Sequence, residues 1–314
     1  MRYVVTGAAG FIGSALSKKL LDMGHSVIGI DCFLENLYPN DRKFENIRKL
    51  REKKEFTFHN LDLRESSNHI DLEGVETVYH LAAMAGLKSV WTDFKIYQDC
   101  NLLATNILLQ NIKSYPGVKL VYASTSSVYG RVATGGEDLP TNPCSPYGVT
   151  KLAAEALIKS YDLNFGLDHK ILRLFSVYGP NQRPDMAYSR IIEKIYNKEE
   201  IEIFGDGEQV RSNTYIDDVI DALVIADVKN SQNSIYNVAG NESISLNSAI
   251  KCISENLGKS ALLKYGNVRD GDQLTTEGKS HLLCKDFGWR PQVNFETGIQ
   301  MQIEHFLKNK MEIG

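Results

Sequence analysis

Residues Tyr3–Ser14 read YVVTGAAGFIGS, and this stretch decides the fold expected for the chain. A short apolar, β-branched run ends at Thr6, and Gly7, Gly10 and Gly13 follow at intervals of three. Glycines between a strand and a helix allow a tight turn, close approach of a diphosphate to the backbone, and close helix–strand packing. The spacing is GxxGxxG, whereas the standard fingerprint is GxGxxG. The pattern predicts a dinucleotide-binding turn, the alternative being a sharp turn with no ligand.

The second expected strand, Ser26–Asp31, ends in a carboxylate. An acidic side chain at that point can accept hydrogen bonds from both hydroxyls of an adenosine ribose, and its charge repels a 2′-phosphate. No lysine or arginine follows until Arg42. We therefore predict that the cofactor is NAD rather than NADP, with Asp31 bound to its ribose.

Short β-branched runs alternate with amphipathic stretches through the first half of the chain. The runs predict strands at Tyr3–Thr6, Ser26–Asp31, Phe56–His59, Thr77–Leu81, Leu120–Ser124 and Lys170–Phe175. The amphipathic stretches predict helices at Ser14–Met23, Phe94–Ser114 and Tyr147–Asn164. This alternation predicts an α/β fold with a Rossmann-like, doubly wound parallel sheet, covered by helices on both faces.

After residues 179–180 the loops become longer and more polar, which predicts a second, smaller α/β domain. Residues 214–226 and 234–240 resemble a helix and a strand that return to the first sheet. We therefore expect a dinucleotide-binding domain of residues 1–175 plus 213–239. The second domain would consist of residues 176–212 plus 240–314.

Composition and charge exclude several classes of partner. The chain has 35 Lys and Arg against 39 Asp and Glu, so a general electrostatic attraction to nucleic acid or anionic membranes is not expected. No apolar run approaches the length of a membrane helix. The five cysteines are scattered without a CxxC pair, and no HExxH occurs, so we expect no metal site. Unpaired thiols favour a reducing cytoplasm.

A tyrosine and a lysine four residues apart, in SPYGVTK at residues 145–151, form the second motif that carries chemistry. On a helix, Tyr147 and Lys151 share one face, while Pro146 suits the first turn and Ser145 the cap. A free tyrosine is a poor base at neutral pH, but a nearby ammonium and a nicotinamide cation would favour its phenolate. The pair predicts a proton acceptor, the alternative being a solvated helix face.

The third motif is ASTSSVYG, residues Ala123–Gly130, at the carboxyl end of an expected strand. Open parallel sheets place their ligand sites at these strand ends. Four adjacent hydroxyls, from Ser124, Thr125, Ser126 and Ser127, can donate and accept hydrogen bonds with a sugar. The alternative is an ordinary polar strand-to-loop junction.

Together these motifs resemble the extended short-chain dehydrogenases/reductases, and within them the nucleotide-sugar 4-epimerases. The resemblance covers nearly the whole chain and also includes NLDLR (60–64), HLAA (80–83), LFSVYGP (174–180) and FGDGEQVRS (204–212). It implies NAD-dependent epimerisation of a UDP-sugar through a transient 4-keto intermediate, with Thr125, Tyr147 and Lys151 as catalytic residues. It also implies a homodimer formed through helices 94–114 and 147–164.

The resemblance further implies two sets of binding residues. The residues expected to contact or order NAD are Gly7, Gly10, Phe11, Ile12, Gly13, Asp31, Asp62, Leu63, Leu81, Ala82, Ala83, Asn101, Ser124, Tyr147, Lys151 and Val177. The residues expected to contact the UDP-sugar are Lys88, Thr125, Ser126, Ser127, Ser176, Arg183, Arg211 and Arg269. The last two would hold the UDP diphosphate in the second, nucleotide-sugar-binding domain.

The subgroup that the chain resembles most is the UDP-glucuronate 4-epimerases, through GPNQRPDMA at residues 179–187. In that subgroup the residues matching Ser126, Ser127, Ser176 and Arg183 surround the sugar carboxylate. Two departures stand out: the basic residue of one sugar-binding loop is Lys88 in GLKSVW, and a T-x-A-D pattern is replaced by TTEGKS at residues 275–280.

Other activities remain open at this point. UDP-glucose or UDP-N-acetylglucosamine could be the sugar, and a 4-keto uronate could also lose carbon dioxide. A 4,6-dehydratase would by the same resemblance need an Asp-Glu pair where this chain has Ser126 and Ser127. A dinucleotide-sensing module without turnover should lack the Tyr147 and Lys151 pair, which this chain retains.

Overall fold

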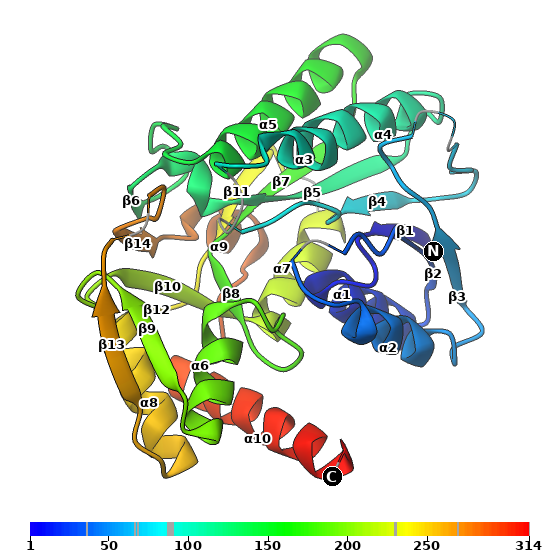
Figure 1. The fold of residues 1–314 in the computed structure, drawn as a ribbon. Coiled ribbons are helices and arrows are strands. Elements are labelled where there is room, and N and C mark those ends of the chain that lie inside the picture. Colours follow the sequence, from blue (N-terminus) through cyan, green and yellow to red (C-terminus); the bar gives the residue numbers. More distant parts are fainter. Residues whose placement is uncertain are drawn as a thin grey trace.

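The computed structural model describes residues 1–35, 37–65, 67, 69–86, 91–228, 231–268 and 270–313. Its main layer is a parallel sheet of seven strands among these residues, in the order β11-β7-β5-β4-β1-β2-β3 (Figure 1). The strands are β1 (Arg2–Thr6), β2 (Ser26–Asp31), β3 (Phe56–Asn60), β4 (Thr77–His80), β5 (Lys119–Thr125), β7 (His169–Leu174) and β11 (Ile235–Val238). The strand order reverses between β1 and β4, where such sheets bind ligands at their carboxyl ends.

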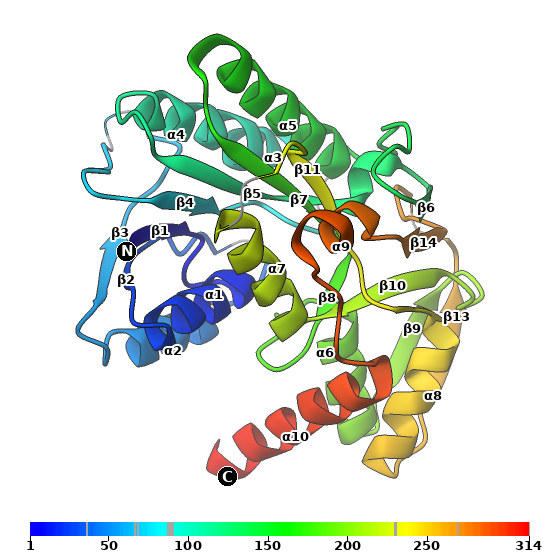
Figure 2. The same cartoon turned by 180° about the vertical axis from the view of Figure 1, so that it is seen from behind.

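Helices cover both faces of this sheet (Figures 1 and 2). One face carries α1 (Phe11–Asp22), α2 (Asp41–Leu50) and α7 (Ile216–Val228). The other carries α3 (Phe94–Gln98), a π-helical turn η1 (Asp99–Leu103), α4 (Ala104–Ile112) and α5 (Pro146–Phe165). Along β1, Tyr3 and Val5 pack in the core with α1, whereas Val4 packs in the core with α4 and α5. This two-sided burial confirms the predicted doubly wound, Rossmann-like sheet.

A smaller layer lies beside the main sheet (Figure 1). Its strands are β12 (Glu242–Ser245), β10 (Val210–Tyr215), β14 (Thr275–Gly278) and β6 (Val132–Gly135), with β8 (Ser176–Tyr178) paired to β10, and β9 (Glu200–Phe204) paired to β13 (Leu262–Gly266). The helices that accompany it are α6 (Ala187–Asn197), α8 (Leu246–Leu257), α9 (His281–Phe287) and α10 (Phe295–Ile313). None of the helices in the described part of the chain is both long and apolar enough to cross a membrane.

The six predicted strands of the first half are confirmed, with ends that differ by at most one residue. Three differences concern other elements. Helix α2 was not predicted, because six of its ten residues are charged and only Ile47 and Leu50 are buried. The helix expected over Phe94–Ser114 is interrupted by the π-helical turn. The helix expected from residue 214 begins at Ile216, since the preceding residues belong to β10.

The expected division into two domains stays a prediction. Strand β10 runs through the expected boundary between residues 212 and 213, and its whole length pairs within the smaller layer. Strand β6, expected in the first domain, pairs with β14 of the second. The two parts are therefore connected by shared strands as well as by crossovers of the chain.

The glycine turn packs α1 directly onto the end of β1. Gly7 has a φ of +69°, and a Cβ added there would lie 2.9 Å from the backbone nitrogen of Ala82. A Cβ on Gly13 would lie 2.1 Å from the carbonyl oxygen of Gly7, a distance that no side chain tolerates. These two glycines let the first turn of α1 sit against the ends of β1 and β4.

A buried ion pair fastens α5 to the main sheet. Glu155 of α5 and Arg173 of β7 are 1% and 4% exposed, and their bidentate contacts measure 2.7 and 3.0 Å. Ser124, at the end of β5, also donates its hydroxyl to Glu155. Because every charged atom here is paired, the helix is held in one position over β5 and β7.

We expect Arg173→Met to destabilise the protein by about 3–5 kcal/mol, since it leaves the Glu155 carboxylate buried without its counter-charge. The free energy of unfolding from denaturant titration measures this loss. Replacing both partners, with Glu155→Gln added, should recover part of the stability. A single variant as stable as the wild type would contradict the expectation.

Candidate active site

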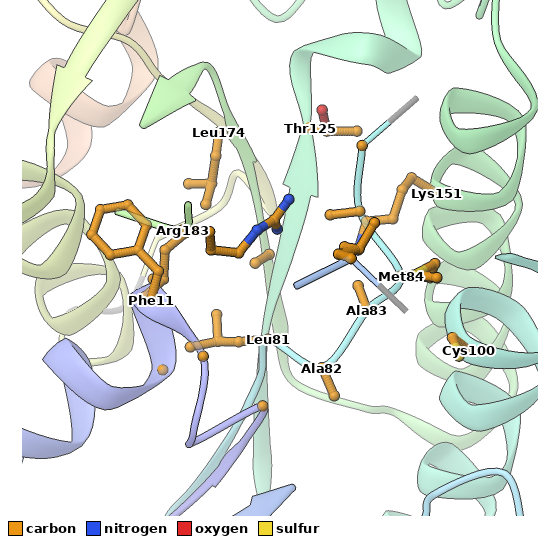
Figure 3. A pocket seen from close by; sticks show the side chains of 18 of the residues that line it. Phe11, Leu81, Ala82, Ala83, Met84, Cys100, Thr125, Lys151, Leu174 and Arg183 are labelled. Carbon is orange, nitrogen blue, oxygen red and sulfur yellow. The ribbon is translucent and has the colours of Figure 1, made fainter. Parts of the chain in front are cut away.

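A cavity of about 480 Å³ lies along the carboxyl ends of the parallel strands, where the main sheet meets the smaller layer (Figure 3). It extends from Asp31 and Asp62 past the glycine turn to Tyr147 and Lys151. Arg183 reaches into it from the side opposite Lys151. The cavity therefore brings together the three motifs that the sequence singled out.

Asp31 is held by backbone groups at one end of the cavity. Its carboxylate accepts hydrogen bonds from the backbone nitrogens of Ala9, at 3.2 Å, and Phe33, at 2.9 Å. Burial raises the pKa of Asp31, while the Phe33 hydrogen bond and the nearby Lys43 ammonium act in the opposite direction. Each carboxylate oxygen keeps a further lone pair, so Asp31 can still accept two hydroxyl donors.

Tyr147 and Lys151 lie in the first two turns of α5 at the other end. As expected, Pro146 begins this helix and the Ser145 side chain caps it, accepting from the nitrogen of Gly148 at 3.2 Å. Burial raises the pKa of Tyr147, and the Thr125 hydroxyl and the Arg183 guanidinium oppose this shift.

The Lys151 ammonium lies 4.0 Å from the centre of the Tyr122 ring. Burial lowers the pKa of Lys151 to about 7, although the Glu155 carboxylate one turn later on the helix acts to raise it. Lys151 is 2% exposed, so its charge is poorly solvated and is sensitive to any ionised group that enters the cavity.

The hydroxyl row follows directly from β5. Thr125 caps the short 3₁₀ helix η2 (Ser126–Tyr129), since its hydroxyl oxygen accepts from the nitrogen of Ser127 at 3.1 Å. The same hydroxyl donates to the Ser127 side chain at 3.2 Å. These bonds fix the positions of the Thr125 and Ser127 hydroxyl groups in the cavity wall that Tyr147 also lines.

Asn101 acts behind the cavity wall rather than in it. Its side chain accepts from the nitrogen of Met84 at 2.8 Å and donates to the carbonyl of Met84 and the hydroxyl of Thr150, both at 3.0 Å. It sits in the π-helical turn between α3 and α4, which turns the side chain toward α5. Asn101 therefore ties the loop after β4 to the helix that carries Tyr147.

Arg183 is engaged by a neighbour in the same loop. Its guanidinium forms two parallel hydrogen bonds with Asp185, at 3.0 and 2.9 Å, and lies over the ring of Tyr38. Its remaining N–H groups are available to an acceptor in the cavity, since a guanidinium has five.

Most of the predicted binding residues line this one cavity. Those in its wall are Gly7, Gly10, Phe11, Ile12, Gly13, Asp31, Asp62, Leu63, Leu81, Ala82, Ala83, Ser124, Thr125, Ser126, Ser127, Tyr147, Lys151, Ser176, Val177 and Arg183. Two of the predicted residues, Lys88 and Arg269, lie outside the described residues. Arg211 is described but is not in the wall, and it pairs instead with Asp272 at 2.8 Å.

Asp62 is in the wall but has a strong partner. Its carboxylate forms a bidentate ion pair with Arg64, with a shortest contact of 2.6 Å, which lowers the pKa of Asp62. Its predicted contact with adenine stays a prediction.

Several lining residues had no signal in the sequence that singled them out. Tyr38, Lys43, Met186 and Gln273 all face the cavity. Tyr38 follows Asp31 in the loop after β2, and Lys43 lies in the first turn of α2; both come shortly after a strand end, which is the kind of position that could have indicated them. Gln273 is contributed by a loop far along the chain, and only the tertiary structure brings it here. Among the described residues, no cluster of histidine, cysteine or acidic side chains could hold a metal ion.

A glycine turn, an acidic strand end and a Tyr–Lys pair around one cavity define a dinucleotide-dependent site of the Rossmann-like class. The chain belongs to the NAD dependent epimerase/dehydratase family, whose pattern matches residues 3–239. This finding confirms the resemblance seen in the motifs.

Named relatives match the chain over almost its full length. A UDP-glucuronate 4-epimerase from Thermodesulfobacterium geofontis is 36% identical over 313 residues, covering 98% of this chain and 96% of that protein. The crystal structure of a UDP-glucuronic acid 4-epimerase from Bacillus cereus, in complex with UDP-glucuronic acid and NAD, superposes with a TM-score of 0.92 at 36% identity, covering 98% of this chain and 100% of that chain. A UDP-glucose 4-epimerase from Mycolicibacterium smegmatis is 30% identical, covering 99% of this chain and 100% of that protein.

The depressed pKa of Lys151 predicts how stability depends on pH. The unfolded chain keeps this proton up to its ordinary pKa of 10.5, whereas the folded chain loses it above about 7. The folded state thus binds fewer protons in this window, so through this group the free energy of unfolding rises with pH. Below about pH 7 the full cost of burying the ammonium remains.

We therefore expect ligand-free Lys151→Met to be more stable than the wild type at pH 6, with an advantage that shrinks toward pH 10. Denaturant titrations across this range measure it, and Lys159→Met, an exposed position on the same helix, is the control. A stability difference between Lys151→Met and the wild type that does not change with pH would contradict the depressed pKa of Lys151.

Proposed function

We propose that this chain is an NAD-dependent UDP-sugar 4-epimerase whose substrate is UDP-glucuronate, which it converts to UDP-galacturonate for polysaccharide biosynthesis. The observation that carries this is the single cavity in which Asp31, Tyr147, Lys151 and Arg183 meet. The first would bind the cofactor, the next two would move a proton, and the last would hold a sugar carboxylate. Relatives of this name and a structure with UDP-glucuronic acid and NAD support the proposal.

The residues present fit NAD along the length of the cavity. Asp31 offers free lone pairs for ribose hydroxyls at one end. In the middle, the turn from Gly7 to Gly13 brings backbone N–H groups at the start of α1 to the cavity, where a diphosphate would be favoured. Lys151 and Tyr147 lie at the far end, where the nicotinamide would bind. When bound, NAD would supply the hydride acceptor for C4 of the sugar.

The proton of the sugar 4-hydroxyl would pass to Tyr147. The Thr125 hydroxyl offsets part of the rise that burial causes in the pKa of Tyr147, so it can relay the proton or stabilise the phenolate. The Lys151 ammonium, on the same face of α5, would favour the phenolate form of Tyr147. The same groups would return the proton when the 4-keto sugar is reduced on its other face, so that the reaction inverts C4 without net oxidation.

The substrate assignment depends on Arg183. A uronate carboxylate could take the N–H groups of Arg183 that Asp185 does not use, together with hydroxyls from Ser127 and Ser176. UDP-glucose is the second candidate. The observation that favours it is the Arg183–Asp185 ion pair, which already neutralises the guanidinium, and a relative named UDP-glucose 4-epimerase supports it.

A homodimer in the cytoplasm is the quaternary and cellular setting that we propose. The helices expected to pair carry exposed apolar side chains, with Phe94, Leu103 and Val149 each more than two-fifths exposed. A second copy of the chain would cover them. The five cysteines are free, which suits a reducing compartment. Partners other than the UDP-sugar and this second copy, such as nucleic acid or a membrane, are not part of the proposal.

Tyr147→Phe should keep its fold and NAD content but lose at least ~100-fold in turnover, the usual scale for a general base. Turnover is measured as UDP-galacturonate formed from UDP-glucuronate, with UDP-glucose assayed in parallel. Tyr97→Phe is a matched control, because Tyr97 is buried with its ring centre 6.4 Å from that of Tyr147, and its hydroxyl has no partner among the described residues. Normal turnover by Tyr147→Phe would rule out the mechanism.

Arg183→Lys should lower epimerisation of UDP-glucuronate and release carbon dioxide, with NADH left on the protein. A guanidinium can hold the carboxylate at two points near the plane of the 4-ketone, which slows decarboxylation, and lysine cannot reproduce this grip. Carbon dioxide and NADH absorbance are measured, with exposed Arg190→Lys as control. Fast wild-type turnover of UDP-glucose with none of UDP-glucuronate would overturn the uronate assignment and leave 4-epimerisation standing.

A further inference from the structure

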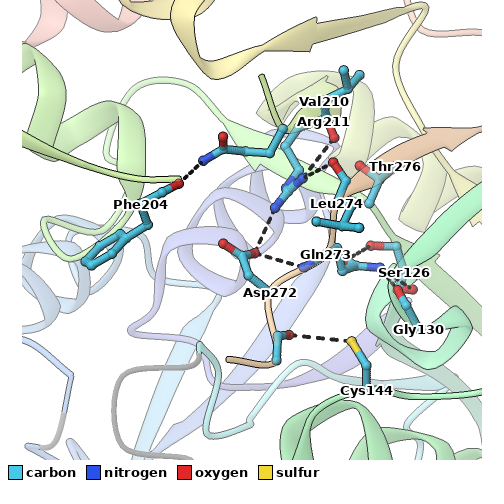
Figure 4. A network of polar contacts seen from close by, with 12 residues as sticks. Ser126, Gly130, Cys144, Phe204, Val210, Arg211, Asp272, Gln273, Leu274 and Thr276 are labelled. Carbon is cyan, nitrogen blue, oxygen red and sulfur yellow. Dashed lines mark hydrogen bonds and ion pairs between the residues drawn. The ribbon is translucent and has the colours of Figure 1, made fainter. Parts of the chain in front are cut away.

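Gln273 joins a loop of the smaller layer to the hydroxyl row of the cavity (Figure 4). Its side-chain nitrogen donates to the backbone carbonyls of Gly130, at 2.8 Å, and Ser126, at 3.2 Å. Its side-chain oxygen accepts from the hydroxyl of Ser126 at 3.3 Å. Three hydrogen bonds therefore connect one glutamine to the turn that follows β5.

The two carbonyls decide the orientation of the Gln273 amide. A carbonyl oxygen can only accept, so the NH₂ group must face Gly130 O and Ser126 O. The amide oxygen is thereby turned toward the Ser126 hydroxyl, and this oxygen too can only accept. Ser126 must therefore donate its single hydroxyl proton to Gln273.

The loop that carries Gln273 is itself anchored. The Asp272 carboxylate accepts from the backbone nitrogen of Gln273 at 2.9 Å and from the guanidinium of Arg211 at 2.8 Å. On the other side, the nitrogen of Leu274 donates to the carbonyl of Arg131 at 2.8 Å. Gln273 is thus held in place from both sides and does not depend on Ser126 for its position.

The neighbouring serine has the opposite hydrogen-bonding character. Ser127 receives a hydrogen bond on its hydroxyl oxygen from Thr125, so its own proton is free to be donated. Ser126, by contrast, can offer the cavity only the lone pairs of its oxygen. A carboxylate needs donors, whereas a sugar hydroxyl can donate, so the two serines suit different groups of a sugar.

We propose that Gln273 is a specificity-determining residue, which holds the Ser126 proton so that Ser126 accepts from a sugar hydroxyl and is withheld from a sugar carboxylate. A carboxylate would then rely on Ser127 and Arg183, a departure from the subgroup that the chain resembles, in which the residue matching Ser126 also lies beside the carboxylate. This inference rests on the proposed function, since it assumes a UDP-sugar in the cavity. Gln273 acts here through Ser126, as a positioning residue, and not on the reacting atoms.

The test compares affinities for two sugars that differ at C6. Dissociation constants of UDP-glucuronate, UDP-glucose and UDP are measured by calorimetry on NAD-loaded wild type, Gln273→Met, Ser126→Ala and the double variant. Methionine keeps the volume of glutamine but cannot accept the Ser126 proton strongly. We expect Gln273→Met to shift the affinity ratio toward UDP-glucuronate by roughly 5-fold, the value of one released hydrogen bond.

The double variant shows whether Gln273 acts through the Ser126 hydroxyl or independently of it. In the Ser126→Ala background the Gln273 change should leave the ratio unaltered, because no hydroxyl remains to be released. Affinity for UDP reports on the loop held by Arg211 and Asp272, and exposed Gln300→Met on α10 is the matched control. A ratio unchanged in Gln273→Met, or one that shifts equally without Ser126, would overturn the proposal.

Ser126→Ala alone keeps the proposal testable if Gln273→Met does not fold. Because Ser126→Ala removes an acceptor for sugar hydroxyls, it should weaken the binding of UDP-glucose at least as much as that of UDP-glucuronate. A selective loss of affinity for UDP-glucuronate would overturn the inference. Wild-type turnover is assayed beside these measurements. Binding without turnover would contradict the proposed function while the affinity ratio still decides the role of Gln273, and binding of neither sugar would overturn both.

Discussion

The buried ion pair between Glu155 and Arg173 is the interaction on which the rest of the site depends. It joins the helix that carries Tyr147 and Lys151 to the strand next to the hydroxyl row. From Arg173 the contacts continue through Tyr129, at 2.9 Å, to Asn237 of β11, at 2.8 Å. The backbone nitrogen of Asn237 donates in turn to the Glu137 carboxylate at 2.8 Å. A charged network this deep is stable only when every member is satisfied, so it permits one position of α5 over the sheet.

That position also sets the electrostatics of the cavity. Burial raises the pKa of Tyr147 and lowers that of Lys151 to about 7, so in the free protein both groups are pushed toward neutrality. The Glu155 carboxylate opposes the shift at Lys151, and the Arg183 guanidinium opposes the shift at Tyr147. Helix α5 therefore carries both Glu155, which is part of the buried ion pair, and the two residues Tyr147 and Lys151 that would move the proton. The hydroxyls beside them are also held in place, because Thr125 is hydrogen-bonded to Ser127 and Ser126 donates to Gln273.

Periodicity and glycine spacing were sufficient for the main sheet, because every strand there except the edge strand β3 is buried on both faces. They failed at α2, where a helix packs through only two buried side chains, Ile47 and Leu50, and its charged surface hides the pattern. They also failed to reveal the π-helical turn, whose Asn101 is hydrogen-bonded to Met84 and Thr150, residues that lie far from it along the chain. Arg211, expected at the ligand, is engaged by Asp272 instead of lining the cavity, and only the fold places those two residues together.

The sequence by itself determined the doubly wound sheet, the glycine turn with Asp31, and the Tyr147–Lys151 pair, because these depend on residues that are neighbours along the chain or share one helix face. The tertiary structure alone decided how the pieces act on one another. It paired Arg211 with Asp272, placed Tyr38 and Lys43 in the wall, and brought Gln273 onto Ser126 across 147 positions of sequence. Hydrogen-bond direction depends on which groups meet in space, and local patterns of residues do not carry that information.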